Sequence, residues 1–223
     1  MKTESASRQF DLIVFDWDGT LCDSTGLIVR SIQGACRDVG VPVPADRDAA
    51  YVIGLGLRDA LAHVAPGLAE ARYQEMVERY RHHYLGHHRG LLLFPGVLPM
   101  LQGLRQRGHH LAVATGKARR GLDEALTIAD LHGLFDATRT ADETASKPDP
   151  RMLHELIEHF GVPPQRTLMI GDTTHDLQLA LNAGTASLGV SYGAHDHGTF
   201  APFGPRHVAH SVIELAQWLE QHA

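Results

Sequence analysis

The sequence has few cysteines, few aromatic residues and no long hydrophobic run. Two cysteines among 223 residues, with no Cys-x-x-Cys pair, provide neither a disulfide framework nor a cysteine zinc site. No stretch approaches the roughly 18 apolar residues that a membrane helix requires. Residues 1–9 are polar and contain no apolar signal core, so we expect a reduced, cytoplasmic protein without membrane association.

Positive charge is also scarce. Twenty Lys and Arg residues stand against 26 Asp and Glu residues, which gives a formal net charge of −6. This balance excludes the broad basic surface that binds nucleic acid or anionic lipid. The 16 histidines lack the spaced Cys/His pattern of a structural zinc site, so they predict pH-sensitive solubility and no metal centre.

Short apolar runs alternate with helical patterns over most of the chain. Runs typical of buried strands cover residues 10–15, 110–114, 135–140, 167–170 and 186–190. Helical patterns lie between the later runs, at residues 96–107, 120–129, 150–160 and 176–182. Such alternation is typical of an α/β fold, so we predict a Rossmann-like, doubly wound parallel sheet with helices on both faces.

The segment 21–93 interrupts this alternation. It contains helical patterns at residues 25–39, 58–64 and 68–84 and no strand signal. A purely helical segment between the first two strands is best explained as an insertion. We therefore predict an α-helical cap domain at 21–93, inserted into a catalytic core domain formed by 1–20 and 94–223.

Polar residues cluster at the carboxyl ends of the predicted strands, where ligands bind in open parallel sheets. They are Asp16, Asp18, Thr115, Gly116, Lys117, Asp172 and Asp176, with Lys147 before the helix that leads to the fourth strand. Several carboxylates in one small volume repel one another unless a cation neutralises them. Because all candidate ligands are oxygens, Mg²⁺ is favoured over zinc. Mg²⁺ that is bound by carboxylates commonly also coordinates a phosphate oxygen of the substrate, so the expected substrate carries phosphate.

The same residues predict phosphoryl chemistry. Asp16 is placed to accept a phosphoryl group covalently, which splits one difficult step into two easier ones. Asp18, two residues later, is placed to protonate the leaving oxygen and then to activate water. A lysine and a hydroxyl at the same spot would stabilise the charge on the phosphoryl oxygens.

Four sequence motifs, in order, resemble those of the haloacid dehalogenase-like superfamily of phosphatases. They are Asp16-x-Asp18-Gly19-Thr20-Leu21-x-Asp23-Ser24, Thr115-Gly116, Lys147-Pro148 and Gly171-Asp172-x-x-x-Asp176. The resemblance covers nearly the whole chain, because the helical insertion also resembles the cap of that family. Dehalogenating members lack an aspartate at the position of Asp18, so its presence points to phosphate chemistry.

The resemblance implies a role for each of these residues. Asp16 would be the phosphoryl acceptor and a Mg²⁺ ligand, and Asp18 would be the general acid and base whose backbone carbonyl also binds the metal. Thr115, Gly116 and Lys147 would bind the phosphoryl group. Asp172 would bind Mg²⁺ directly. Asp176 would either bind Mg²⁺ or contact one of the groups that bind it.

Within the superfamily the sequence is most similar to phosphoglycolate-phosphatase-like members. The run Gly54-Leu55-Gly56-Leu57 is similar to a glycine-containing cap loop that reaches into the site in those enzymes, and Arg58 after it is a candidate ligand for a substrate carboxylate or second phosphate. The expected partner is a small phosphorylated metabolite, and the expected state is a monomer or weak homodimer.

Two alternatives remain open from the sequence. The β-phosphoglucomutases share the core motifs and a similar cap, so these motifs do not separate hydrolysis from phosphoryl transfer within a sugar phosphate. A phospho-acceptor switch that resembles a response-regulator receiver also combines aspartates, a hydroxyl and a lysine on a parallel sheet. Receivers are shorter and have no helical insertion after the first strand, which disfavours this second alternative.

Overall fold

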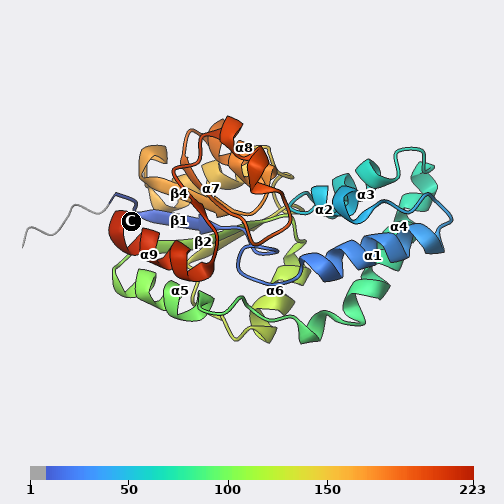
Figure 1. The fold of residues 1–223 in the computed structure, drawn as a ribbon, viewed down its shortest axis with the longest axis horizontal. Helices are drawn as coiled ribbons and strands as arrows, with labels where there is room; N and C mark the ends of the chain where they lie inside the picture. The colour runs from blue at the N-terminus through green and yellow to red at the C-terminus, as the bar shows by residue number, and fades with distance from the viewer. Residues whose placement is uncertain (1–8) are drawn as a thin grey trace, which may run out of the picture.

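A six-stranded parallel sheet forms the centre of the protein in a computed structural model that describes residues 9–223, except the side chain of Arg89 (Figure 1). Its strands are β1 (Leu12–Phe15), β2 (His110–Thr115), β3 (Ala137–Thr140), β4 (Thr167–Gly171), β5 (Ala186–Val190) and β6 (Val208–Ala209). The strand order is β3-β2-β1-β4-β5-β6, so the predicted doubly wound parallel sheet is confirmed. The prediction for residues 1–9 falls, apart from Gln9, outside the described residues.

Helices cover both faces of the sheet (Figure 1). They are α5 (Val97–Gln106), α6 (Arg119–Ile128), α7 (Arg151–Phe160), α8 (Thr174–Ala183) and α9 (Val212–His222). Strand β1 is buried along its whole length, and its side chains alternate between the two layers. Ile13 and Phe15 pack with α5, α6 and α9, whereas Leu12 and Val14 pack with α7 and α8.

A group of helices lies between β1 and β2 in the chain and to the right of the sheet in Figure 1. It comprises α1 (Thr25–Asp38), α2 (Asp46–Tyr51), α3 (Leu57–Val64), α4 (Glu70–Leu85) and the 3₁₀ turn η1 (His88–Gly90). We call these elements the helical cap. They enclose an apolar cluster of their own, in which Ile32, Leu61 and Met76 are almost completely buried. The domain boundaries at 20/21 and 93/94 stay a prediction.

The remaining short elements do not change this architecture. They are the 3₁₀ turns η2 (Pro164–Arg166), η3 (His197–Thr199) and η4 (Ala201–Phe203). Among the described residues, no helix has both the length and the apolar character that crossing a bilayer requires.

The strand order places the ends of β1 and β4 side by side. Phe15 pairs with Ile170, and the backbone N–H of Asp16 donates a hydrogen bond to the carbonyl of Ile170 at 2.9 Å. The chain passes from β1 to β2 on one side and from β4 to β5 on the other side of this pair of strands. In open parallel sheets, ligands bind in the crevice at the carboxyl ends of two strands whose connections run in opposite directions. The fold therefore brings the predicted aspartates after β1 and β4 to one place.

Candidate active site

Asp16, Lys147 and Asp176 meet beyond the end of β1. The Nζ atom of Lys147 lies 2.7 Å from Oδ1 of Asp16 and 2.6 Å from Oδ1 of Asp176. All three residues are buried, including the lysine, whose relative exposure is only 2%. A buried ammonium is stable only when it is paired, and here two carboxylates provide the pairing.

The start of helix α8 holds Asp176 in place. Thr173 is the N-cap residue, and its hydroxyl and backbone N–H donate hydrogen bonds to Oδ2 of Asp176 at 2.6 and 3.1 Å. The backbone N–H of Asp176 donates back to the Thr173 hydroxyl oxygen at 3.3 Å, which completes a capping box. Because Lys147 binds its other oxygen, both carboxylate oxygens of Asp176 have partners.

Asp172 follows β4 and is held by two donors. The Thr20 hydroxyl donates to Oδ1 at 2.9 Å, and the backbone N–H of Ala194 donates to Oδ2 at 2.7 Å. Gly19 lies against the same carboxylate with φ +78°, and a Cβ atom there would collide with Asp172. Only glycine therefore satisfies both the backbone conformation and the close approach at this turn.

The cluster contains three buried carboxyl groups but only one lysine, so its negative charges would outnumber its positive charge if all groups were ionised. Burial raises the pKa of Asp16 to about 7, although attraction to Lys147 offsets part of this effect. Burial, followed by repulsion from Asp16 and Asp176, raises the pKa of Asp172 well above its ordinary value. Burial alone would lower the pKa of Lys147, but its two carboxylate partners together raise it, so this ammonium stays charged.

The acidic cluster fits a hard divalent cation. Carboxylate oxygens of Asp16, Asp172 and Asp176 all lie within 4.8 Å of one another. Neither oxygen of Asp16 accepts a hydrogen bond despite complete burial, since Lys147 is close to Oδ1 but outside hydrogen-bonding geometry. A buried carboxylate oxygen that accepts no hydrogen bond is costly, and a cation would both bind the Asp16 oxygens and neutralise the excess negative charge of the cluster. An oxygen-only donor set favours Mg²⁺ over softer metals.

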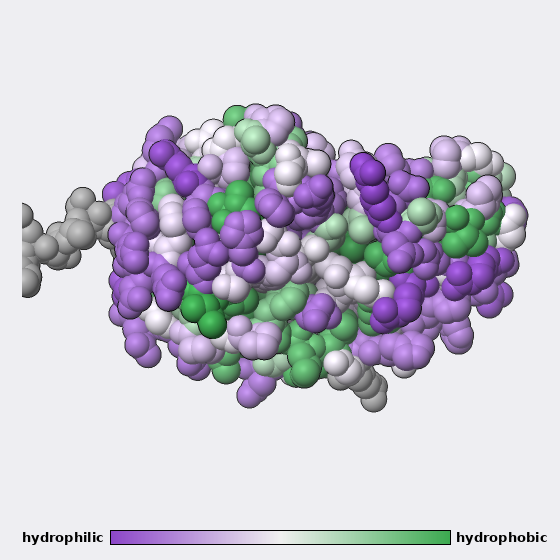
Figure 2. Space-filling view, in the orientation of Figure 1, coloured by the Kyte–Doolittle hydropathy of each residue, from purple (hydrophilic) through white to green (hydrophobic). Residues whose placement is uncertain are grey.

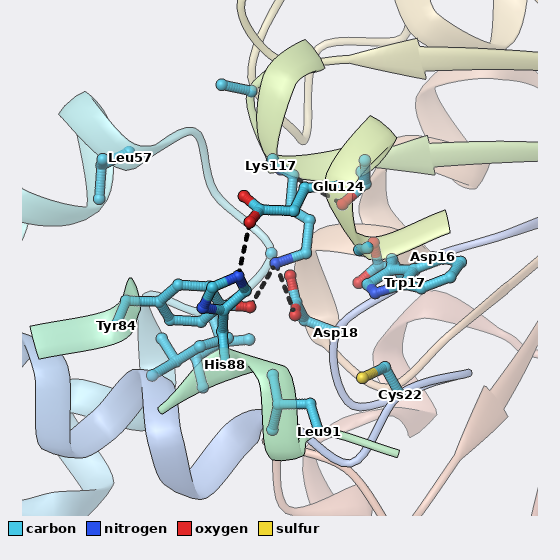
Figure 3. A pocket seen from close by; sticks show the side chains of 18 of the residues that line it. Asp16, Trp17, Asp18, Cys22, Leu57, Tyr84, His88, Leu91, Lys117 and Glu124 are labelled. Carbon is cyan, nitrogen blue, oxygen red and sulfur yellow. Dashed lines mark hydrogen bonds and ion pairs between the residues drawn. The ribbon is translucent and has the colours of Figure 1, made fainter. Parts of the chain in front are cut away.

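Asp18 lies next to this cluster and is held by its own set of contacts (Figure 3). The Ser24 hydroxyl donates to Oδ1 of Asp18 at 2.6 Å, and Nζ of Lys117 lies 3.1 Å from the same oxygen. Lys117 also donates to the hydroxyl of Tyr84, a cap residue, at 3.0 Å. The carboxylate that is predicted to transfer protons is therefore linked to the cap through one lysine.

Thr115 and Gly116 end strand β2 at the same edge of the sheet. Thr115 is almost completely buried, and both residues line the cavity that contains Asp16. A Cβ atom at Gly116 would collide with the backbone carbonyl oxygens of Gly54 and Leu55. The glycine-containing segment of the cap thus lies directly against the core at this point.

Arg58 is not brought to the site. Its side chain has a relative exposure of 76% and forms an ion pair with Glu70 on the surface of the cap. It is absent from the lining of the cavity, among the described residues. The expectation that Arg58 contacts substrate therefore receives no support from its position.

One cavity of about 630 Å³ lies between the core and the cap (Figure 3). Asp16, Asp18 and Thr115 line it on the core side, and helices α1, α3 and α4 contribute to the cap side. Trp17 also lines it, which fits a packing wall beside the aspartates. A volume in the range of roughly 300–1,000 Å³ is typical of small-molecule sites.

Sequence reasoning missed several contacts at this cavity. Lys117 was predicted to lie in the polar cluster without a stated partner, and its side chain is only 10% exposed and is paired with Asp18. His88 places Nε2 at 2.8 Å from Glu124 and Nδ1 at 2.9 Å from the carbonyl of Leu85. No pattern in the sequence indicates these pairs, because each joins residues from different elements.

Two core histidines also contact the cap. The Nε2 atoms of His175 and His195 lie 2.8 and 3.0 Å from the carbonyl oxygen of Tyr51. A carbonyl only accepts hydrogen bonds, so both rings donate to it. Burial lowers the pKa of both histidines, which favours the neutral rings.

Comparison with known proteins places this geometry in a family. The family model described as haloacid dehalogenase-like hydrolase matches residues 13–190. "Probable phosphatase IndB" from Dickeya dadantii is 37% identical over 190 residues, which cover 82% of each chain. "Phosphoglycolate phosphatase" from Aliivibrio fischeri is 34% identical and covers 84% of this chain and 86% of its own.

Solved structures agree with this assignment. A "predicted phosphoglycolate phosphatase" from Haemophilus somnus 129PT superposes with a TM-score of 0.82 at 28% sequence identity, over 95% of this chain and 99% of its own. The resemblance inferred from the four motifs is thereby confirmed, and the receiver alternative is removed. The chain belongs to the haloacid dehalogenase-like hydrolase family.

Proposed function

We propose that the protein is a Mg²⁺-dependent phosphomonoester hydrolase that acts on a small phosphorylated metabolite through an aspartyl-phosphate on Asp16. The observation that carries this proposal is the cluster of three buried carboxylates, Asp16, Asp172 and Asp176, with a single ammonium, that of Lys147, among them. Relatives named phosphatase, at 34% and 37% identity, support the same reaction class.

In the first step, an oxygen of Asp16 attacks phosphorus and forms an O–P bond while the bond from phosphorus to the ester oxygen breaks. Asp18 gives its proton to the departing oxygen, so the product leaves as an alcohol. Lys147 and Thr115 bind the transferring phosphoryl oxygens and stabilise their charge. Mg²⁺, held by Asp16, Asp172 and the backbone of Asp18, would neutralise the carboxylates and the phosphoryl group.

In the second step, Asp18 accepts a proton from water as the water oxygen attacks the phosphorus of the aspartyl-phosphate. The bond from phosphorus to Asp16 then breaks, which regenerates the carboxylate and releases inorganic phosphate. Asp18 ends the cycle protonated, ready to act as the acid again. Ser24 and Lys117 keep its carboxylate oriented toward the site throughout.

The test is replacement of Asp16 by Asn, which keeps the shape and removes the nucleophile. We expect release of phosphate from p-nitrophenyl phosphate to fall to background in the variant, and to stop in wild-type protein when EDTA removes Mg²⁺. Circular dichroism should show an unchanged fold. Substantial turnover by Asp16→Asn would contradict the assignment of the nucleophile.

The phosphomutase alternative requires an aspartyl-phosphate that survives release and rebinding of a sugar phosphate. Two relatives above 30% identity, at 37% and 34%, are named as phosphatases, which favours hydrolysis. Incubation with hexose phosphates distinguishes the two reactions, because a mutase forms an isomeric sugar phosphate and a hydrolase forms free sugar and phosphate.

A further inference from the structure

The part of the cavity beyond the phosphoryl site has an apolar wall. The residues of this wall are apolar side chains of the cap and of the segment that leads from the cap back to the core. The cap contributes Ile28, Ile32, Val52, Ile53, Leu57 and Leu85, and the returning segment contributes Leu91, Leu92 and Leu93. Helix α6 of the core adds Ala125 and Ile128, and its C-cap residue Ala129 also lines the cavity. The wall is continuous with the catalytic aspartates, since Asp16 and Asp18 line the same cavity.

Large apolar side chains are exposed where this cavity opens. Leu85, Leu92 and Ile128 have relative exposures of 47%, 74% and 38%, and all three line the cavity. Figure 2 shows hydrophobic surface in the lower middle of the view, near where α6 lies in Figure 1. Apolar side chains gathered at a concave site are typical of ligand recognition.

An aromatic ladder forms part of the cap side. Tyr80 stacks on Tyr84 with ring centroids 5.9 Å apart, and Tyr84 stacks on His88 at 5.8 Å. All three residues line the cavity, and Tyr84 and His88 are labelled in Figure 3. These rings add apolar area to the cavity, and Nζ of Lys117 lies 4.9 Å from the centroid of the Tyr84 ring.

Two basic side chains inside the cavity already contact carboxylates. Lys117 is paired with Asp18, and His88 is hydrogen-bonded to Glu124. Two arginines of the described lining, Arg81 and Arg120, are exposed on α4 and α6. Water solvates such exposed groups, so they contribute little to binding of a second anionic group of the substrate. Among the described side chains of the lining, the only largely buried cation is therefore Lys117, which already contacts Asp18 and the Tyr84 hydroxyl.

We propose that the leaving group of the natural substrate is apolar or aromatic, so that the preferred substrates are monoesters of a hydrophobic alcohol and not phosphoglycolate or pyrophosphate. This inference rests on the proposed function, because the cavity wall selects the group that is attached to the phosphate held at Asp16. Burial of that group against the wall supplies binding free energy in proportion to its apolar area.

The test uses n-alkyl phosphates from ethyl to hexyl, whose leaving alcohols have nearly the same pKa. We expect kcat/KM to rise by up to about fourfold per added methylene, the ratio that corresponds to full burial of one methylene. Phosphoglycolate is the matched control, since it is ethyl phosphate with a carboxylate in place of the methyl group. It should be hydrolysed no faster than ethyl phosphate, and pyrophosphate should be a poor substrate.

The outcomes separate this inference from the proposed function. If p-nitrophenyl phosphate is hydrolysed but the alkyl series is flat, or phosphoglycolate exceeds hexyl phosphate, the inference fails and the phosphatase assignment stands. If no ester is hydrolysed in the presence of Mg²⁺, the proposed function fails and the inference fails with it. A rising series that Asp16→Asn abolishes supports both.

Surface variants locate the effect on the cavity wall. Leu92→Gln and Ile128→Gln should each lower the ratio of kcat/KM for hexyl over ethyl phosphate by about two- to fivefold, since each removes apolar contact area. Ile213→Gln is the control, because Ile213 is 67% exposed on α9 and does not line the cavity. An unchanged ratio in both cavity variants would overturn the assignment of this wall.

Discussion

The two ends of the cavity differ in what holds them in place. At the phosphoryl end, buried charges are fixed by short contacts, such as those of Lys147 with Asp16 and Asp176. At the leaving-group end, the wall consists of apolar side chains such as Ile53, Leu57 and Leu92, which have no directional contacts. The first end depends on exact residue types, whereas the second depends mainly on volume and apolar character.

This difference suggests that the phosphoryl end tolerates few substitutions, whereas the leaving-group end tolerates changes that alter which substrate fits. Removing one partner from a buried polar network leaves another group unpaired, at a cost of several kcal/mol. Exchanging one apolar side chain for another of similar volume usually costs less than about 1.5 kcal/mol. A new leaving group can therefore be accommodated by changes in the wall while the chemistry stays the same.

The sharpest way to probe the phosphoryl end is Asp18→Asn. It should lower kcat/KM for ethyl phosphate by about 10²–10⁴-fold, because an alkoxide is a poor leaving group without a proton. The loss in kcat/KM for p-nitrophenyl phosphate should be smaller, since nitrophenolate leaves without one. Slow hydrolysis of the intermediate should then produce a burst of nitrophenol.

Asp23→Asn is the matched control for this experiment. Asp23 belongs to the same sequence motif but is exposed and does not line the cavity, so activity toward both esters should be retained. An equal loss with both esters in Asp18→Asn, without a burst, would show that Asp18 does not transfer the proton.

A smaller loss of activity is expected for Lys147→Met. Loss of one buried donor to the transferring group should lower kcat by about 10²–10³-fold, a magnitude typical of electrostatic stabilisers. The variant should also lose stability, by about 3–5 kcal/mol, because two buried carboxylates lose their ammonium partner. Steady-state kinetics and urea unfolding in the absence of Mg²⁺ measure the two effects.

The control for Lys147 is Arg151→Met. Arg151 is also cationic and paired, with Asp149 at 3.0 Å, but its side chain is 62% exposed. Exposed ion pairs contribute about 0–1 kcal/mol, so this variant should keep near-normal stability and activity. If both variants behaved alike, the contrast between a buried and an exposed cation would be wrong.

The sequence predicted the parts of the fold that depend on continuous burial. Strands β1, β2, β4 and β5 follow largely buried apolar runs, because both faces of a parallel sheet are covered. Strand β6 was missed because it has only two residues, Val208 and Ala209, and helix α2 was missed because only Ala49 of its six residues is buried. Elements this short carry no periodic sequence signal, and contacts with neighbouring elements determine their secondary structure.

At the site, the motifs predicted which residues lie together but not all of their partners. Asp16 and Asp172 converge because strand order dictates it. The contacts of Lys117 with Asp18 and Tyr84 depend on how the cap docks on the core, and no spacing in the chain encodes that. Arg58 was expected near the site because it follows the run 54–57, but within the cap its side chain pairs with Glu70, the first residue of α4.

The smallest predicted effect concerns stability, and it tests whether the excess negative charge at the phosphoryl end needs a cation. The folded-state pKa of Asp16 is raised from 3.8 to about 7, and that of Asp172 is raised in the same direction. Between pH 4 and pH 7 the unfolded chain loses these protons while the folded protein retains them. Stability of the metal-free protein from this source therefore falls as pH rises through that window.

Binding of Mg²⁺ should reverse this loss, so the gain in Tm on adding Mg²⁺ should grow from pH 5 to pH 8, reaching about 5 °C or more. The histidines with lowered pKa, His175 and His195, act in the opposite direction, but their contribution largely cancels in the difference with and without Mg²⁺. Asp16→Asn should raise the metal-free Tm at pH 8 and lose most of the Mg²⁺ gain. A gain that is equal at both pH values would show that these carboxylates are already charged without the metal.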